Sequence, residues 1–297
     1  MLFFSLSCRL EGDLILLPVE FSPSYDVGVI SKSSAFVAGD SFGVYAYHRK
    51  DGALPDSKMP DFMNGVEVSF DGDIWRYDPQ MYWPQNEADK ISFVAYSPYS
   101  YGDSPTDVDI SAENMPVLNF DLQESGGKVD LLAAKTTTSR LDGAVNLEFQ
   151  HLLCKIDVYF KHSNQGGFST VQKITYKDIK CPTEFCFADL DDTSLGSWDP
   201  QSNQEYNLGL DHDLEVVGTT EVTTDAYSVY MPPADLSGKM IVTIDGVDYV
   251  IKGDKLDGLM PGKAITIQVL IENMALVYEV SVSDWKLMEK SDPTYIY

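Results

Sequence analysis

The sequence is short of basic residues, and this shortage excludes two classes of partner. Its 297 residues include 21 lysines and arginines against 46 aspartates and glutamates, which gives a formal net charge of −25. Nucleic-acid binding needs a basic surface, so no nucleic-acid partner is expected. Adsorption to an anionic membrane surface is disfavoured for the same reason.

The excess of acidic residues has two interpretations. The first is a solvated surface that keeps an exported protein soluble. The second is calcium binding by loops in which carboxylates gather, although neither loop has the glycine that an EF-hand requires at its sixth position. The two loops contain Asp189, Asp191 and Asp192, and Asp211, Asp213 and Glu215.

Cysteine and histidine are also scarce, with four of each in the chain. No CxxC motif or zinc-ligand spacing occurs, so neither a metal centre nor a cofactor is expected. GxSxG, HExxH and phosphate-loop motifs are missing too, and we therefore expect no catalytic activity. Cys154 fits a small buried hydrophobic residue. Cys181 and Cys186 either form a disulfide or remain thiols.

The N-terminus carries a short apolar run that ends at Cys8 and is too short to span a bilayer. It has the character of the end of a secretory signal followed by a lipobox cysteine. We therefore expect residues 1–13 to be a truncated lipoprotein signal with its lipidation site at Cys8. Acyl chains would then anchor an exported protein to the outer membrane at the cell surface. The alternative is an unstructured terminus.

Apolar residues alternate with polar ones along much of the chain, and sustained helical periodicity is missing. Residues 265–271 and 276–283 each predict a strand with one buried face. The pairs Asp245-Gly246 and Asp71-Gly72 predict tight hairpin turns, because both residue types tolerate positive φ. Many short strands separated by such turns predict an all-β protein built from sandwiches.

The alternation changes parity across residues 150–154. Val145, Leu147 and Phe149 put odd positions inside, whereas even positions are inside from Ile156 onward. A bend or bulge is therefore predicted here, because one extra residue turns every later side chain to the other face. His151 lies at this point, and we expect it to be a structural residue of the bend rather than a catalytic one.

A polar stretch at residues 135–140 precedes a new strand and predicts a domain boundary. We therefore expect one β-sandwich at residues 14–140 and a second at residues 141–297, which ends in a short tail. Residues 183–225 are rich in aspartate, serine and asparagine and predict a loop-rich insertion.

Several segments carry a further signal when they are taken in order: residues 39–47 (GDSFGVYAY), 75–84 (WRYDPQMYWP), 91–99 (ISFVAYSPY), 130–134 (DLLAA), 145–156 (VNLEFQHLLCKI) and the closing pair Asp284 and Trp285. Together they resemble the fimbrillin-like family of Gram-negative anaerobes, whose members form or cap type V pili. The resemblance covers about residues 14–286. It implies two tandem β-sandwich domains of transthyretin-like type.

The resemblance also implies assembly by strand exchange with other pilus subunits. In the family, proteolysis after a basic residue releases the first strand, and the terminal strand of another subunit fills the groove. Here the displaced strand would be residues 14–21. The processing site would be Lys32, where the family often has arginine. The tail at residues 286–297 is short, which favours a tip, anchor or adhesin-like subunit. We expect the uncut chain to be monomeric.

An aromatic-rich stretch supports an alternative, a glycan-binding surface lipoprotein with a host or bacterial glycan or protein as its ligand. Exposed rings stack on sugars, whereas covered rings only pack a core. The candidate stacking residues are Trp75, Tyr77, Tyr82 and Trp83.

Overall fold

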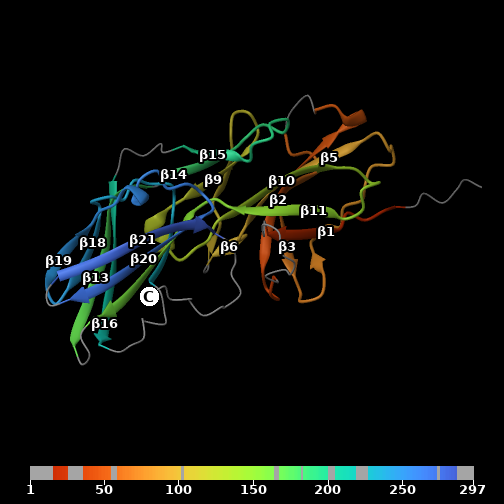
Figure 1. Ribbon diagram of the computed structural model, residues 1–297. Coiled ribbons are helices and arrows are strands. Elements are labelled where there is room, and N and C mark those ends of the chain that lie inside the picture. The colour runs from red at the N-terminus through yellow and green to blue at the C-terminus, as the bar shows by residue number, and fades with distance from the viewer. Residues whose placement is uncertain are drawn as a thin grey trace, which may run out of the picture.

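The molecule is elongated, with a seven-stranded sheet at one end and a pair of four-stranded sheets at the other (Figure 1). A further four-stranded sheet lies between them. The computed structural model describes residues 16–25, 36–54, 59–101, 104–163, 167–181, 183–199, 205–218, 227–272 and 275–285. Within these ranges no helix is long and apolar enough to span a bilayer. The helical elements are η1 (Lys50–Gly52), α1 (Leu122–Ser125) and η2 (Asp254–Leu256).

The seven-stranded sheet has the order β1-β11-β10-β5-β2-β3-β4. Its pairs are antiparallel except that β1 runs parallel to β11. The predicted hairpin between β3 and β4 is confirmed, but its turn is longer than predicted: residues 71–74 connect the strands, and Phe70 pairs with Trp75. The strands are β1 (Phe21–Tyr25), β2 (Ser41–Arg49), β3 (Met63–Phe70), β4 (Trp75–Arg76), β5 (Lys90–Ser97), β10 (Leu132–Thr138) and β11 (Val145–His151).

The central strands of this sheet are buried on both faces, which explains their nearly continuous apolar sequences. Phe42 and Val44 point to one face of β2 and belong to a core with Phe93 of β5. Tyr45 and Tyr47 point to the other face and join the core of the rest of the molecule. The sheet thus separates two apolar layers.

The C-terminal sandwich consists of two sheets with the orders β17-β12-β20-β21 and β16-β13-β18-β19. The alternation in β20 is confirmed, since Ile265 and Ile267 are fully buried. Asp245 and Gly246 have φ of 49° and 78° in the β18–β19 turn, as a tight hairpin requires. The strands are β12 (Cys154–His162), β13 (Phe168–Lys180), β16 (Glu205–Val217), β17 (Tyr227–Met231), β18 (Met240–Ile244), β19 (Val247–Ile251), β20 (Lys263–Glu272) and β21 (Ala275–Asp284).

The burial predicted for residues 276–283 is only partly correct. Leu276, Tyr278 and Val280 are half-buried, but Val282 is 43% exposed. The reason is that β21 is the edge strand of its sheet, so the opposite sheet covers only part of its inner face.

The sheet between the two ends has the order β15-β14-β9-β8 and draws strands from both halves of the chain. One prediction is corrected here. The segment at residues 183–225 is not a loop-rich insertion, because three strands occur in it. The seven-stranded sheet continues to His151. The remaining strands are β8 (Val108–Ile110), β9 (Pro116–Phe120), β14 (Thr183–Phe187) and β15 (Gly196–Asp199), with the small pair β6 (Ser100–Tyr101) and β7 (Ser104–Pro105).

The predicted bend after β11 is confirmed, and it marks the passage between the two ends of the molecule. Phe149 of β11 lies in the core on the N-terminal side, and Ile156 of β12 lies in the other core. Leu152 and Leu153 connect them and are 2% and 0% exposed. The parity change arises because the chain leaves one sheet and enters another.

Candidate functional site

The N-terminal segment at residues 16–25 closes one edge of the seven-stranded sheet (Figure 1). Its first half pairs with an aromatic loop: the amide of Val19 donates to the carbonyl of Met81 at 2.9 Å, and the amide of Trp83 donates to Leu17 at 2.9 Å. Its second half, β1, pairs with β11, and Val145 N donates to Glu20 O at 2.7 Å. The segment therefore contacts two elements through its backbone.

Side chains of this segment alternate between a covered groove and the solvent. Val19 and Phe21 are 1% and 7% exposed, whereas Leu16 is 56% exposed. The Phe21 ring packs edge-on against three rings of the groove, which are those of Phe42, Tyr77 and Phe93 at centroid distances of 5.7, 5.5 and 5.8 Å. Phe21 is thus the side chain that fixes the strand in its groove.

One wall of the groove adds a polar contact to this packing. The Tyr77 hydroxyl donates to the carbonyl of Val19 at 2.8 Å. Burial raises the pKa of Tyr77 to about 12, so the phenol stays neutral and remains a donor at physiological pH. The Gln80 amide nitrogen donates to the Tyr77 oxygen at 2.8 Å. The role of Gln80 is not visible in the sequence, because a single polar residue in a loop has no periodicity.

The predicted sugar platform is wrong for most of its members, because the rings are covered. Trp83 is 4% exposed and packs against Phe93. Trp75 is half-buried among other rings, including those of Phe36 and Phe42. Of the four candidates, Tyr82 alone is exposed, at 43%. Trp75, Tyr77 and Trp83 therefore belong to the core around the N-terminal strand.

Two predicted sites lie outside the described residues. These are the lipidation site Cys8 and the processing site Lys32. Leu14 and Ile15, the first two residues of the predicted displaced strand, lie outside them as well.

The first predicted calcium loop, which contains Asp189, Asp191 and Asp192, binds the side chain of a lysine from another strand. The Lys135 ammonium donates to the carbonyls of Asp189 and Asp192, both at 2.9 Å, and to that of Ala188 at 3.4 Å. Arg49 forms an ion pair with Asp191 at 2.8 Å. Cations of the chain itself thus occupy the loop, and the calcium interpretation is wrong there.

The second predicted calcium loop is not a loop. Asp211, Asp213 and Glu215 lie within β16. Among the described residues, no group of three or more candidate ligands is placed to hold a metal ion.

His151 has a structural environment, as expected. Its Nδ1 lies 3.0 Å from Asp130, and its ring stacks on Trp285. Cys154, Cys181 and Cys186 are thiols. Burial raises the pKa of Cys154 to about 12 and that of Cys181 to about 11, so neither is a reactive thiolate.

Comparison with known proteins places this architecture. The family model described as fimbrillin-like matches residues 30–285. A fimbrial protein from Bacteroides vulgatus ATCC 8482 is 18% identical over 91% of this chain and 99% of its own, with a TM-score of 0.61. A candidate cell adhesion protein from Bacteroides ovatus ATCC 8483 is 18% identical over 93% and 100%, with a TM-score of 0.63. A similar candidate from Bacteroides uniformis ATCC 8492 is 16% identical over 91% and 99%, with a TM-score of 0.55. No curated protein matches the chain.

Proposed function

Because the chain belongs to the fimbrillin-like family, we propose that it is a cell-surface pilus subunit that assembles by exchange of its N-terminal strand. The observation that carries this proposal is the seating of Val19 and Phe21 in an aromatic groove. In this function the subunit has a tip, anchor or adhesin-like role, and its fold consists of two tandem sandwiches of transthyretin-like type. Catalysis has no part in it.

The groove is built for an extended strand with alternating side chains. Burying a large apolar side chain contributes about 1.5–3 kcal/mol, so Val19 and Phe21 supply most of the apolar gain of the segment. Leu16 and Glu20 face away from the groove. If the segment left, the rings of Phe42 and Phe93 would lose their cover. A strand with the same alternation from another subunit would restore it.

Cleavage at Lys32 would leave this strand held only by non-covalent contacts. Lys32 follows β1 and precedes Phe36, where the described chain resumes. Cutting there converts the strand from part of the chain into a bound peptide that another strand can replace. The proposed lipid anchor at Cys8 would lie on the released piece, so anchored and assembled forms would be alternative states of one subunit at the outer membrane.

A lysine-specific protease applied to the folded full-length protein tests this mechanism. Cleavage after Lys32 is expected to allow the excised strand to exchange with a labelled synthetic peptide of residues 14–25. A peptide with Phe21→Ala should bind at least a hundredfold more weakly, since a buried Phe→Ala change costs about 3–5 kcal/mol. A peptide with Leu16→Ala is the matched control and should bind nearly as well, because that side chain is 56% exposed.

The uncut protein serves as a second control. It should be monomeric in size-exclusion chromatography and should take up no peptide, as should a Lys32→Gln variant treated with the protease. Filaments formed by uncut protein, or cut protein that binds both substituted peptides equally, would contradict strand exchange through this groove.

A further inference from the structure

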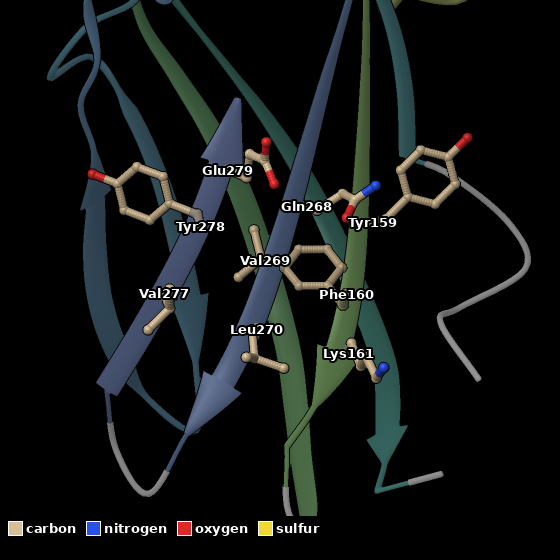
Figure 2. A pocket seen from close by; sticks show the side chains of 9 residues that line it. All are labelled: Tyr159, Phe160, Lys161, Gln268, Val269, Leu270, Val277, Tyr278 and Glu279. Atoms are coloured by element: carbon tan, nitrogen blue, oxygen red, sulfur yellow. The ribbon is translucent and has the colours of Figure 1, made fainter. Parts of the chain in front are cut away.

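The outer face of the sheet β17-β12-β20-β21 contains a hollow of about 260 Å³. It lies in the C-terminal sandwich, at the opposite end of the molecule from the N-terminal strand (Figure 1). Phe160 and Val269 point inward, since they are 0% and 1% exposed. Their neighbours in sequence therefore point outward into the hollow, as strand geometry requires. The hollow belongs to strands β12, β20 and β21 (Figure 2).

Strand register places three functional groups in one row across the hollow. Tyr159 of β12 pairs with Gln268 of β20, and Gln268 pairs with Glu279 of β21. Figure 2 shows the three side chains following one another across the strands. Neighbouring strands lie about 4.8 Å apart, so the row spans about 10 Å. It offers a phenol ring, an amide and a carboxylate in that order.

A second row borders the first and is mainly apolar. Lys161 pairs with Leu270, and Leu270 pairs with Val277. Val277 is 53% exposed. The hollow therefore combines an aromatic ring and aliphatic side chains with four kinds of hydrogen-bonding group, since Lys161 adds an ammonium to the phenol, amide and carboxylate. This mixture of apolar surface and a few convergent polar groups is typical of small-molecule sites.

Two polar groups of the hollow, the amide of Gln268 and the carboxylate of Glu279, differ from those elsewhere on the same face. Asp157 forms an ion pair with Lys155 at 2.9 Å and accepts a hydrogen bond from Ser228 at 2.5 Å. Within the described part of the chain, the side chains of Gln268 and Glu279 have no such partner. Their hydrogen-bonding capacity is available to a ligand.

These features suit one class of ligand. A pyranose ring has an apolar face of C–H groups and a rim of hydroxyls, which match an aromatic ring beside amide and carboxylate groups. Anionic sugars are disfavoured by the net charge of −25 on the whole protein, whereas within the hollow the charge of Glu279 is offset by that of Lys161. We propose that the hollow binds a neutral oligosaccharide, with Tyr159 stacking on one ring and Gln268 and Glu279 contacting hydroxyls.

This site is independent of the strand-exchange groove, so either proposal can fail while the other stands. It also differs from the sugar platform predicted from Trp75, Tyr77, Tyr82 and Trp83, which the structure places around the N-terminal strand. Binding here would give the subunit a ligand of its own whether or not it is processed at Lys32.

A printed array tests the proposal with the uncut full-length protein. The array carries neutral oligosaccharides of glucose, galactose, mannose and N-acetylglucosamine, together with sialylated and sulfated counterparts. Retention on neutral members is expected. The affinity of the strongest neutral ligand is then measured by isothermal titration calorimetry.

Three variants locate the binding. Tyr159→Ala should weaken it by about tenfold through loss of the aromatic contact. Glu279→Gln should also weaken it by about tenfold, since hydrogen bonds to charged groups are the stronger ones. Glu279 is exposed, so this variant should fold normally even if Tyr159→Ala does not. Ser283→Ala is the matched control, on the same strand and face but outside the hollow, and should leave affinity unchanged.

Three results would overturn the proposal. The first is no retention on any neutral oligosaccharide, and the second is retention on sialylated or sulfated members alone. The third is that Glu279→Gln, like the Ser283→Ala control, binds the sugar with the same affinity as the unmodified protein. If a protein partner bound this face and no sugar did, the proposal would be overturned in the same way as by the absence of retention on neutral oligosaccharides.

Discussion

The indole of Trp285 lies flat on the imidazole of His151, with ring centroids 3.7 Å apart and planes inclined by 12°. The ring of Tyr230 also stacks with the indole, with centroids 5.2 Å apart and planes inclined by 7°. The backbone amide of Trp285 donates to Gly262 at 2.7 Å. The end of β21 is thus fastened to the last residue of β11 and to β17. A residue of the C-terminal sandwich thereby contacts the seven-stranded sheet directly.

Replacing Trp285 with alanine should lower the free energy of unfolding by about 3–5 kcal/mol, as for other buried large-to-small changes. Removing the indole takes away the ring that stacks with His151 and Tyr230, and Trp285 as a whole residue is only 8% exposed. Urea denaturation followed by circular dichroism measures the loss. Asp284→Asn is the neighbouring control: its carboxylate pairs with Lys263 at the surface, and such pairs contribute about 0–1 kcal/mol. Equal losses in the two variants would show that the stack stabilises nothing.

The ring of Tyr96 lies over Gly43 in β2 and leaves no room for a larger side chain. A methyl group at this position would come within 2.2 Å of Cζ of Tyr96. Gly43→Ala should therefore destabilise the protein by about 1–3 kcal/mol, as overpacking does. Gly253→Ala is the control, because no atom lies within 4 Å of the added carbon. It should change stability by no more than about 0.5 kcal/mol.

A double-mutant cycle shows whether Tyr96 is the cause. In a Tyr96→Leu background, the same Gly43→Ala change should cost clearly less than in the unmodified protein. The same cost in both backgrounds would assign the effect to the backbone of β2 instead of the ring.

Lys135 supports the loop that its ammonium occupies. Lys135→Met keeps much of the aliphatic chain but removes the donors to three carbonyls, and should cost about 1.5–3 kcal/mol. Thermal or urea unfolding measures this. Lys50→Met is the control, since Lys50 is exposed.

The melting temperature of the unmodified protein should be the same in EDTA and in calcium chloride. A calcium-dependent rise that Lys135→Met does not alter would restore the calcium interpretation at another site.

Local signals in the sequence predicted the strands well. The alternation of β20 and the turn at Asp245 and Gly246 depend only on residues close together in the chain, so both are visible without a structure. The bend after β11 was visible for the same reason. Pairing of β9 with β14 was not visible, because Phe120 and its partner Thr183 are far apart in the chain and no local pattern records their contact.

The candidate sites were harder to predict, because burial depends on what covers a residue. Trp75 and Trp83 have the composition of a sugar-binding surface, and only the packing of Phe36 and Phe93 against them shows that they are core residues. Likewise, Asp189 and Asp192 have the spacing of a cation loop, but the cation is Lys135 from a distant strand. In both cases the sequence shows the type of each residue but does not show which distant residue packs against it or binds it.

The hairpin turn at Asp71 gives a pH-dependent prediction. Its carboxylate accepts hydrogen bonds from the amides of Ile74 and Asp73, both at 2.9 Å, and from Nε of Arg76 at 2.5 Å. Chiefly through the bond from Ile74, and then through Arg76, the pKa of Asp71 falls to about 2. The folded pKa lies below the unfolded value, so the stabilisation is present above about pH 4 and is lost as the pH falls toward 2.

Titration of the Asp71 side-chain carboxyl by NMR should therefore have its midpoint near 2 in the folded protein. Arg76→Gln should raise that midpoint, yet leave it below the ordinary range, because the two amide donors remain. The two kinds of contact to Asp71 respond differently to salt. The hydrogen bonds from backbone amides belong to the folded turn, whereas the contact with Arg76 is an exposed ion pair that salt screens. Added salt should thus move the midpoint of the unmodified protein more than that of Arg76→Gln. A midpoint near 4 in the folded protein would show that the turn does not hold the carboxylate.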